Sequence, residues 1–87
     1  MKKILFDNNK NIIFERLKYF REKANLSQAN LAAQMQTVGI NIDQQMISKI
    51  EKNQRQVTDY ELACFCKILN VSPEEMLSAF EESHKKD

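Results

Sequence analysis

The chain has 87 residues, of which 43% are hydrophobic and 29% are charged, and its formal net charge is +1. These proportions are typical of one small globular domain, and the absence of any long apolar run excludes a segment that spans a bilayer. A single glycine and a single proline argue against an all-β or linker-rich chain and favour compact helices.

The charge is divided unevenly along the chain. Residues 1–57 contain ten Lys or Arg and five Asp or Glu, a net of +5, whereas residues 58–87 contain three and seven, a net of −4. We expect a positive face on the first part of the fold and an acidic back on the second, which would orient the domain on a polyanion. Chance segregation in a small protein is the alternative.

Cysteines, histidine and the N-terminal residues limit the cofactors and the compartment. Cys64 and Cys66 are two positions apart on an expected helix and point to different faces, so we expect reduced packing residues rather than a disulfide. With a single histidine, His84, in a charged tail, we expect no metal site. The basic opening Met1–Phe6 resembles a signal peptide, but its apolar run stops at Asp7, and we expect a cytoplasmic protein with no membrane partner.

The first helix is predicted over residues 12–24. Its inward stripe at helical spacing consists of Ile13, Leu17 and Phe20. Asn25 follows at a position that suits the left-handed conformation in which helices often end. Residues 1–11 before this helix form an expected N-terminal arm. Its segment Lys2–Phe6 would pack Ile4 or Phe6 on the body, pair with a partner chain, or remain disordered.

A second short helix is predicted over residues 26–35, with Ser27 as its N-cap. Its inward stripe consists of Leu31, Ala32 and Met35. The segment 36–42 then forms a connection in which apolar residues alternate, and these are Val38, Ile40 and Ile42. This alternation predicts a short extended segment that is tucked against the core.

A third helix is predicted around residues 43–52, and it has two different faces. One face suits burial and consists of Met46, Ile47 and Ile50. The other face carries amides, a hydroxyl group and lysines, with no acid among them; its residues are Gln44, Gln45, Ser48, Lys49 and Lys52. Such side chains suit the reading of base edges and phosphates in a DNA major groove. Asp43 is the predicted N-cap, and it places the two glutamines at the start of the helix.

Two further helices have clear starts. Thr58-Asp59-Tyr60-Glu61 is a capping box, and the stripe that follows it consists of Leu62, Phe65, Cys66 and Leu69. Ser72-Pro73-Glu74-Glu75 is a second capping box with proline at the first helical position. We expect this fifth helix to end near residue 80, and residues 81–87 to form a charged tail. Phe80 either faces a dimer partner or covers the edge of its own core.

Several motifs follow one another in a characteristic order. They are Arg21-Glu22-Lys23, Leu26-Ser27-Gln28, Leu31-Ala32, Ile47-Ser48-Lys49-Ile50-Glu51 and Leu69-Asn70-Val71-Ser72. Together they resemble the helix-turn-helix family of the lambdoid phage repressors and Cro, also called the xenobiotic-response-element type. The resemblance covers roughly residues 13–77 and implies an all-α fold, a compact bundle of about five short helices over residues 12–80. The connection 36–42 is longer than the family usually has, which leaves the angle of the recognition helix open.

The resemblance also implies roles for individual residues. Contacts with DNA bases are expected from Gln44, Gln45, Ser48 and Lys49. Contacts with DNA phosphates are expected from Gln28, Lys52, Asn53, Gln54 and Arg55. Arg21 and Glu51 match positions that form a partly buried ion pair between the first helix and the end of the recognition helix, so we expect a structural role for them.

These features predict a bacterial or phage sequence-specific DNA-binding transcriptional regulator, specifically a repressor that acts as a homodimer on double-stranded DNA. The alternative is a protein-interaction module, such as an antitoxin or immunity component, which should show exposed aromatic residues or a broad apolar patch. We expect no enzyme, because no nucleophile–His–carboxylate set, metal cluster or phosphate loop can be assembled. We also expect no cofactor and no small-molecule ligand.

Overall fold

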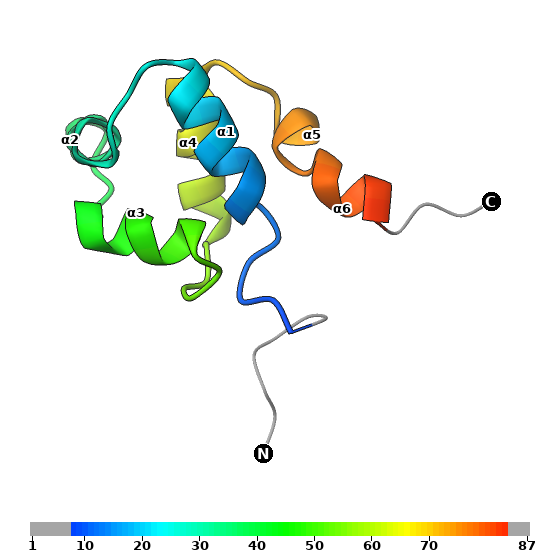
Figure 1. The fold of residues 1–87 in the computed structure, drawn as a ribbon. Helices are drawn as coiled ribbons and strands as arrows, with labels where there is room; N and C mark the ends of the chain where they lie inside the picture. Colours follow the sequence, from blue (N-terminus) through cyan, green and yellow to red (C-terminus); the bar gives the residue numbers. More distant parts are fainter. Residues whose placement is uncertain (1–7, 84–87) are drawn as a thin grey trace.

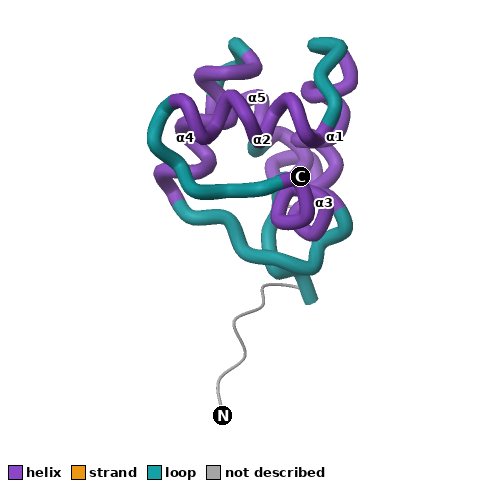
Figure 2. Tube along the Cα trace, turned by 90° about the vertical axis from the view of Figure 1, so that its left-hand side faces the viewer, coloured by secondary structure: helices purple, strands orange, loops and turns teal. Residues whose placement is uncertain are grey.

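The computed structural model describes residues 8–83, which form helices joined by loops, with no strand in that range (Figure 1, Figure 2). The helices are α1 (Phe14–Lys23), α2 (Gln28–Thr37), α3 (Gln44–Glu51), α4 (Asp59–Leu69), α5 (Pro73–Met76) and α6 (Ser78–Ser83). The predicted all-α fold class is confirmed. Within the described range, no helix is long and apolar enough to cross a membrane.

Side-chain caps explain where four of these helices begin. In each case an oxygen of the preceding side chain accepts a backbone N–H of the first turn, and the capping residues are Ser27, Asp43, Thr58 and Ser72. In α4 and α5 the glutamates Glu61 and Glu75 reciprocate by accepting the backbone N–H of the capping residue, which completes both predicted capping boxes. These starts are therefore fixed by local sequence.

Asparagines in the left-handed conformation follow three of the helices. Asn25 after α1 has φ 60°, as predicted, and Asn53 after α3 and Asn70 at the end of α4 have φ 62° and 58°. Asparagine tolerates this region better than most residues with a side chain. The chain thus turns sharply after each helix and brings the next one back onto the core.

The core lies between α1, α2, α3 and α4, with one contribution from α5. Its buried apolar residues are Ile13, Leu17, Leu31, Ala32, Met35, Ile42, Ile47, Ile50, Phe65, Cys66, Leu69 and Met76. The predicted inward stripes are confirmed, except that Phe20, Met46 and Leu62 are only partly buried. Around this core α2 packs on α4, and α3 packs on α1 and α2.

The connection between α2 and α3 differs from the prediction. Because α2 continues for two residues more than expected, the connection begins at Val38. Ile42 is fully buried and Ile40 partly buried, as expected, but Val38 is 47% exposed, so the prediction that it turns inward was wrong. Gly39, with φ 89°, reverses the chain directly after Val38 and leaves that side chain outside. Gln36 then pins the connection by donating its amide N–H to the Ile42 carbonyl at 2.9 Å.

The last predicted helix is divided in two. Leu77 leaves the helical conformation and packs against the core, and α6 begins after it and runs on to Ser83. This break lets α6 lie against α1, where Arg16 and Glu82 form an exposed ion pair at 3.2 Å. Phe80 is partly buried, and its expected role at a dimer or core edge stays a prediction.

The two cysteines are free thiols, as predicted, with Cys66 buried and Cys64 partly buried. Burial raises the pKa of the Cys66 thiol, which suits a packing residue rather than a reactive one. The expected packing of Ile4 or Phe6 lies outside the described residues.

Candidate nucleic-acid interface

The outer face of α3 is available to a partner. α3 runs along the lower edge of the molecule in Figure 1 and packs on α1 and α2 through Ile47 and Ile50, which are fully buried. The opposite side of the helix carries exposed side chains from Gln44, Gln45, Lys49 and Lys52, with Ser48 partly exposed beside them. Within residues 8–83, no hydrogen bond or ion pair engages these five side chains. The face predicted to read DNA is therefore polar, cationic and free of competing contacts in the described part of the chain.

The one acid of α3, Glu51, is neutralised by Arg21. The Arg21 Nε donates to Glu51 Oε2 at 2.7 Å and its Nη2 donates to Oε1 at 3.0 Å, while the two side chains are only 10% and 4% exposed. The hydrogen bond to Glu51 raises the pKa of Arg21 and outweighs the opposing effect of burial. This pair ties α1 to the end of α3, and it removes a negative charge from the edge of the candidate interface.

Gln28, at the start of α2, joins the same pair. Its Nε2 donates to Glu51 Oε1 at 3.0 Å, and the residue is partly buried. The amide that the resemblance assigns to a phosphate contact is thus already bonded to the protein. The bond fixes the first turn of α2 relative to α3.

Arg55 forms a second buried ion pair, which sequence reasoning missed. Its two Nη groups donate to the Glu61 carboxylate at 3.0 Å each, and the side chains are 24% and 6% exposed. Burial alone would raise the pKa of Glu61, but hydrogen bonds from Arg55 and Thr58 outweigh it and hold that pKa below its ordinary value. A signal was present in the sequence, because Glu61 lies four residues before Phe65 on the inward stripe of α4, where an acid requires a partner.

Asn53 is turned towards the N-terminal arm. Its Oδ1 accepts the backbone N–H of Lys10 at 2.9 Å and that of Asn11 at 3.3 Å, and its Nδ2 donates to Asn9 Oδ1 at 2.7 Å. These bonds occupy both ends of the amide that was assigned to a phosphate contact. Gln54, the next residue, is exposed.

Asn11 fastens the arm from the buried side. It is 8% exposed, and its Nδ2 donates to the carbonyls of Ile50 and Arg55 at 2.9 Å each. Its Oδ1 accepts the N–H of Ile13 at the start of α1. Sequence reasoning missed this network as well, and the only hint was the run of asparagines in the arm.

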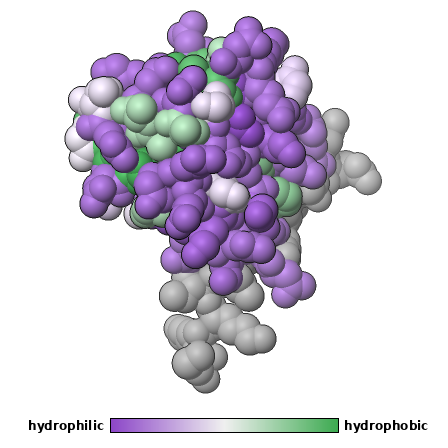
Figure 3. Space-filling view, turned by 60° about the vertical axis from the view of Figure 1, so that its left-hand side comes forward, coloured by the Kyte–Doolittle hydropathy of each residue, from purple (hydrophilic) through white to green (hydrophobic). Residues whose placement is uncertain are grey.

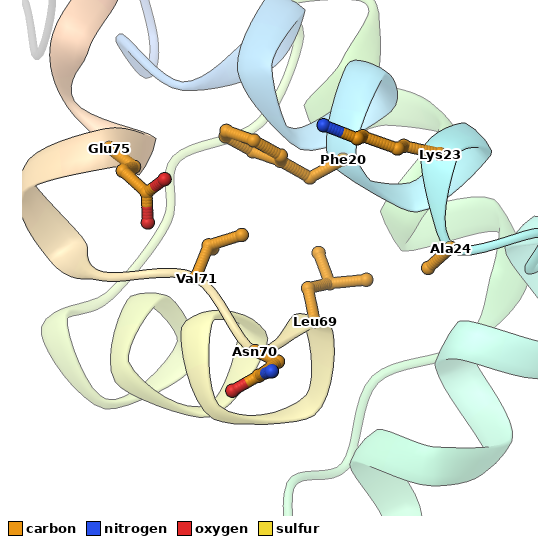
Figure 4. A pocket seen from close by; sticks show the side chains of 7 residues that line it. All are labelled: Phe20, Lys23, Ala24, Leu69, Asn70, Val71 and Glu75. Carbon is orange, nitrogen blue, oxygen red and sulfur yellow. The ribbon is translucent and has the colours of Figure 1, made fainter.

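A hollow lies away from α3, between the end of α1 and the turn from α4 to α5 (Figure 4). Its volume is about 280 Å³, and its lining residues are Phe20, Lys23, Ala24, Leu69, Asn70, Val71 and Glu75. The side of the molecule on which α2 lies is mostly hydrophilic, with small hydrophobic patches (Figure 3). Among the described residues, the exposed large aromatic side chains are Tyr19 and Tyr60, on α1 and α4.

A comparison with protein families agrees with the arrangement of helices. A family model described as helix-turn-helix matches residues 17–76, which is more than half of the chain and extends from α1 to α5. A comparison with curated proteins finds no match. The chain belongs to the helix-turn-helix family of the lambdoid phage repressors and Cro, a family of DNA-binding transcription regulators.

Proposed function

We propose that the protein is a sequence-specific transcriptional repressor that reads the major groove of double-stranded DNA with α3. The outer face of α3 carries this proposal. Its long amide and cationic side chains are exposed and bonded to nothing within residues 8–83, while the acid of the same helix is held by Arg21. A face of this composition lacks the apolar area that a hydrophobic partner would bury. Its side-chain donors and acceptors match those on the edges of DNA bases.

The proposed division of labour follows the position of each residue on α3. Gln44 and Gln45 occupy the first turn, where a glutamine amide makes a bidentate contact with adenine N6 and N7. Ser48 and Lys49 lie one turn further on, and Lys49 reaches either guanine or a phosphate. Asp43 supports this arrangement, because its carboxylate accepts the Met46 N–H at 2.8 Å and so fixes the start of the helix.

Anchoring to phosphates is proposed for Lys52 and Gln54, which are exposed at the end of α3. For Arg55 and Asn53 we propose a structural role instead, because their side chains are bonded to Glu61 and to the arm. Gln28 retains a phosphate role only if its bond to Glu51 leaves the start of α2 open to DNA. Its main proposed task is to orient Glu51.

Selection of bound duplexes from a random DNA pool tests this function. The wild-type protein should enrich one motif with two-fold symmetry, since two protomers are proposed to bind it. Gln45→Ala should enrich a more degenerate motif, whereas the control Gln34→Ala, which changes an exposed glutamine of α2, should enrich the same motif as the wild type. Failure of the wild type to enrich any motif would refute sequence-specific binding.

One observation favours the alternative, a protein-interaction module. Tyr19 and Tyr60 are 50% and 60% exposed, and aromatic residues are frequent in protein interfaces. The two lie on different helices, and neither belongs to α3. A reporter driven by the selected site separates the two functions: Gln45→Ala should weaken repression and Tyr60→Ser should not. The reverse result would favour the interaction module.

A further inference from the structure

We propose that Lys10 is a further phosphate-binding residue of the interface, and that Asn53 positions it beside the end of α3. This inference rests on the proposed DNA-binding function and extends the surface from α3 to the N-terminal arm. Nothing in the sequence pattern of the recognition helix assigns a role to Lys10. Its place in the fold does.

Hydrogen bonds hold the backbone of Lys10 next to the residues that follow α3. The Lys10 N–H donates to Asn53 Oδ1 at 2.9 Å, and Asn53 in turn donates to Asn9 Oδ1 at 2.7 Å. Asn53 directly follows Lys52, which is exposed at the end of the recognition helix. The backbone of Lys10 is therefore hydrogen-bonded to Asn53, the neighbour of the expected phosphate anchor Lys52. Lys10 and Asn53 lie 43 positions apart in the sequence.

The orientation of the arm follows from the buried bonds of Asn11. Asn11 is 8% exposed and bonds to the carbonyls of Ile50 and Arg55, so this residue forms the inner side of the arm. Lys10 precedes it and is exposed. Figure 1 shows the described part of the arm, in blue, at the lower edge of the molecule, beside the loop that follows α3. Lys10 thus lies at the same edge as the face proposed to meet DNA.

Near the end of α3, few free charges of the described residues are available to bind a phosphate. Arg55, which the resemblance would place here as an anchor, is neutralised by Glu61. Between Lys49 and Val57 the only acid is Glu51, and it is paired with Arg21. Together with Lys49 on α3, Lys10 and Lys52 are therefore exposed cations that this edge offers to a phosphate backbone in the described part of the chain.

Salt titrations of DNA binding test the proposal through a double-mutant cycle. The slope of log K against log salt is negative, and each phosphate contact that is lost should reduce its magnitude by about 0.9; a lower slope here means a smaller magnitude. Lys10→Ala should lower the slope by that amount. Asn53→Gly should lower it equally, because glycine adopts φ 62° without strain and the substitution removes only the side-chain bonds. The double variant should lose no more than either single variant, because Asn53 is proposed to act on DNA only through Lys10.

Matched controls separate this effect from general changes in charge or backbone. Lys67→Ala removes an exposed cation near the end of α4, and Asn70→Gly makes the same substitution as Asn53→Gly at another left-handed residue. Both should leave the slope unchanged. Thermal melts should show that all variants are folded under the binding conditions.

Each other outcome overturns a stated part. If Lys52→Ala lowers the slope and Lys10→Ala does not, the DNA-binding function stands and Lys10 has no role in it. If Lys10→Ala lowers the slope and Asn53→Gly does not, or if the two losses add, Asn53 does not position Lys10. If the wild type binds no duplex with a salt-dependent affinity, both the proposed function and this extension of it are refuted.

Discussion

Arg21 and Arg55 each donate two hydrogen bonds to a glutamate whose side chain is almost fully buried. Such a pair is costly to break from one side, because the carboxylate that remains is left without a counter-charge at low dielectric. One pair joins α1 to the end of α3, and the other joins the loop after α3 to α4. Both arginines therefore act first on the stability of the fold.

Removal of Arg21 tests this directly. Arg21→Ala should lower the free energy of unfolding by about 3 kcal/mol, since it leaves the buried Glu51 with the neutral amide of Gln28 but without a counter-charge. Lys18→Ala, an exposed substitution on the same helix, is the matched control and should change stability little. Denaturant unfolding of both variants decides the matter. Small and equal shifts would show that the pair contributes nothing particular.

Acid titration tests the second pair. The pKa of Glu61 is lowered in the folded protein, so the pair stabilises the fold above the ordinary carboxyl value of 4.5 and this contribution is lost as pH falls through the lower folded pKa. Wild type should therefore exceed Glu61→Gln in free energy of unfolding near neutral pH, and the difference should shrink under acid conditions. Urea unfolding over a pH series measures it. A difference that does not vary with pH would rule out a stabilising carboxylate.

The sequence supported some of these residue roles and hid others. Arg21 and Glu51 stand at positions that the family resemblance marks, so their pairing could be predicted. Arg55 follows the recognition helix, where a free cation and a paired one look alike in the sequence. Its partner became visible only when the start of α4 was placed beside it. Asn53 was hidden for the same reason, because its partners lie in the arm more than forty positions away.

At the scale of elements, α3 is proposed both to read bases and to anchor phosphates, and substitutions should separate these two roles. Gln45→Ala should weaken the preferred site by about 1–3 kcal/mol and relax its sequence preference, while binding to random duplexes barely changes, because no charge is lost. Lys52→Ala should weaken specific and random duplexes together and lower the salt slope by about 0.9. Fluorescence anisotropy with both kinds of duplex measures these effects.

Circular dichroism should first show that the two variants keep the wild-type helix content. Both residues are exposed on α3, and the buried pair Ile47 and Ile50 is untouched. If both variants bind every duplex like the wild type at low salt, the outer face of α3 is not the DNA surface. The protein-interaction reading would then be preferred.

Helix starts were predictable and helix ends were less so. The caps at Ser27, Asp43, Thr58 and Ser72 act within one turn, and a short stretch of sequence contains all the information they need. The break at Leu77 and the outward turn of Val38 depend on what the rest of the fold leaves room for. Leu77 packs against the core, whereas the turn at Gly39 leaves the side chain of Val38 in solvent. No local pattern encodes either outcome.

At the scale of the whole molecule, one domain of this size would cover only half of the two-fold site proposed for it. We expect two protomers to bind cooperatively, with the centres of their half-sites about one helical turn (~34 Å) apart along the DNA. Analytical ultracentrifugation with a selected duplex should show two chains per DNA. A stable complex of one chain on a site without repeated halves would refute the homodimer.

The attachment of α3 on several sides has a thermodynamic consequence for recognition. Its inner face is buried in the core, its end is clamped by the Arg21–Glu51 pair, and Asn11 bonds to the carbonyl of Ile50. The backbone that is proposed to meet DNA is therefore ordered before any duplex binds, and little conformational entropy remains to be lost when the complex forms. The free energy of the side-chain contacts with DNA is then reduced little by the entropic cost of ordering the backbone. Under these conditions changes in the interface should appear chiefly in the rate at which the complex dissociates.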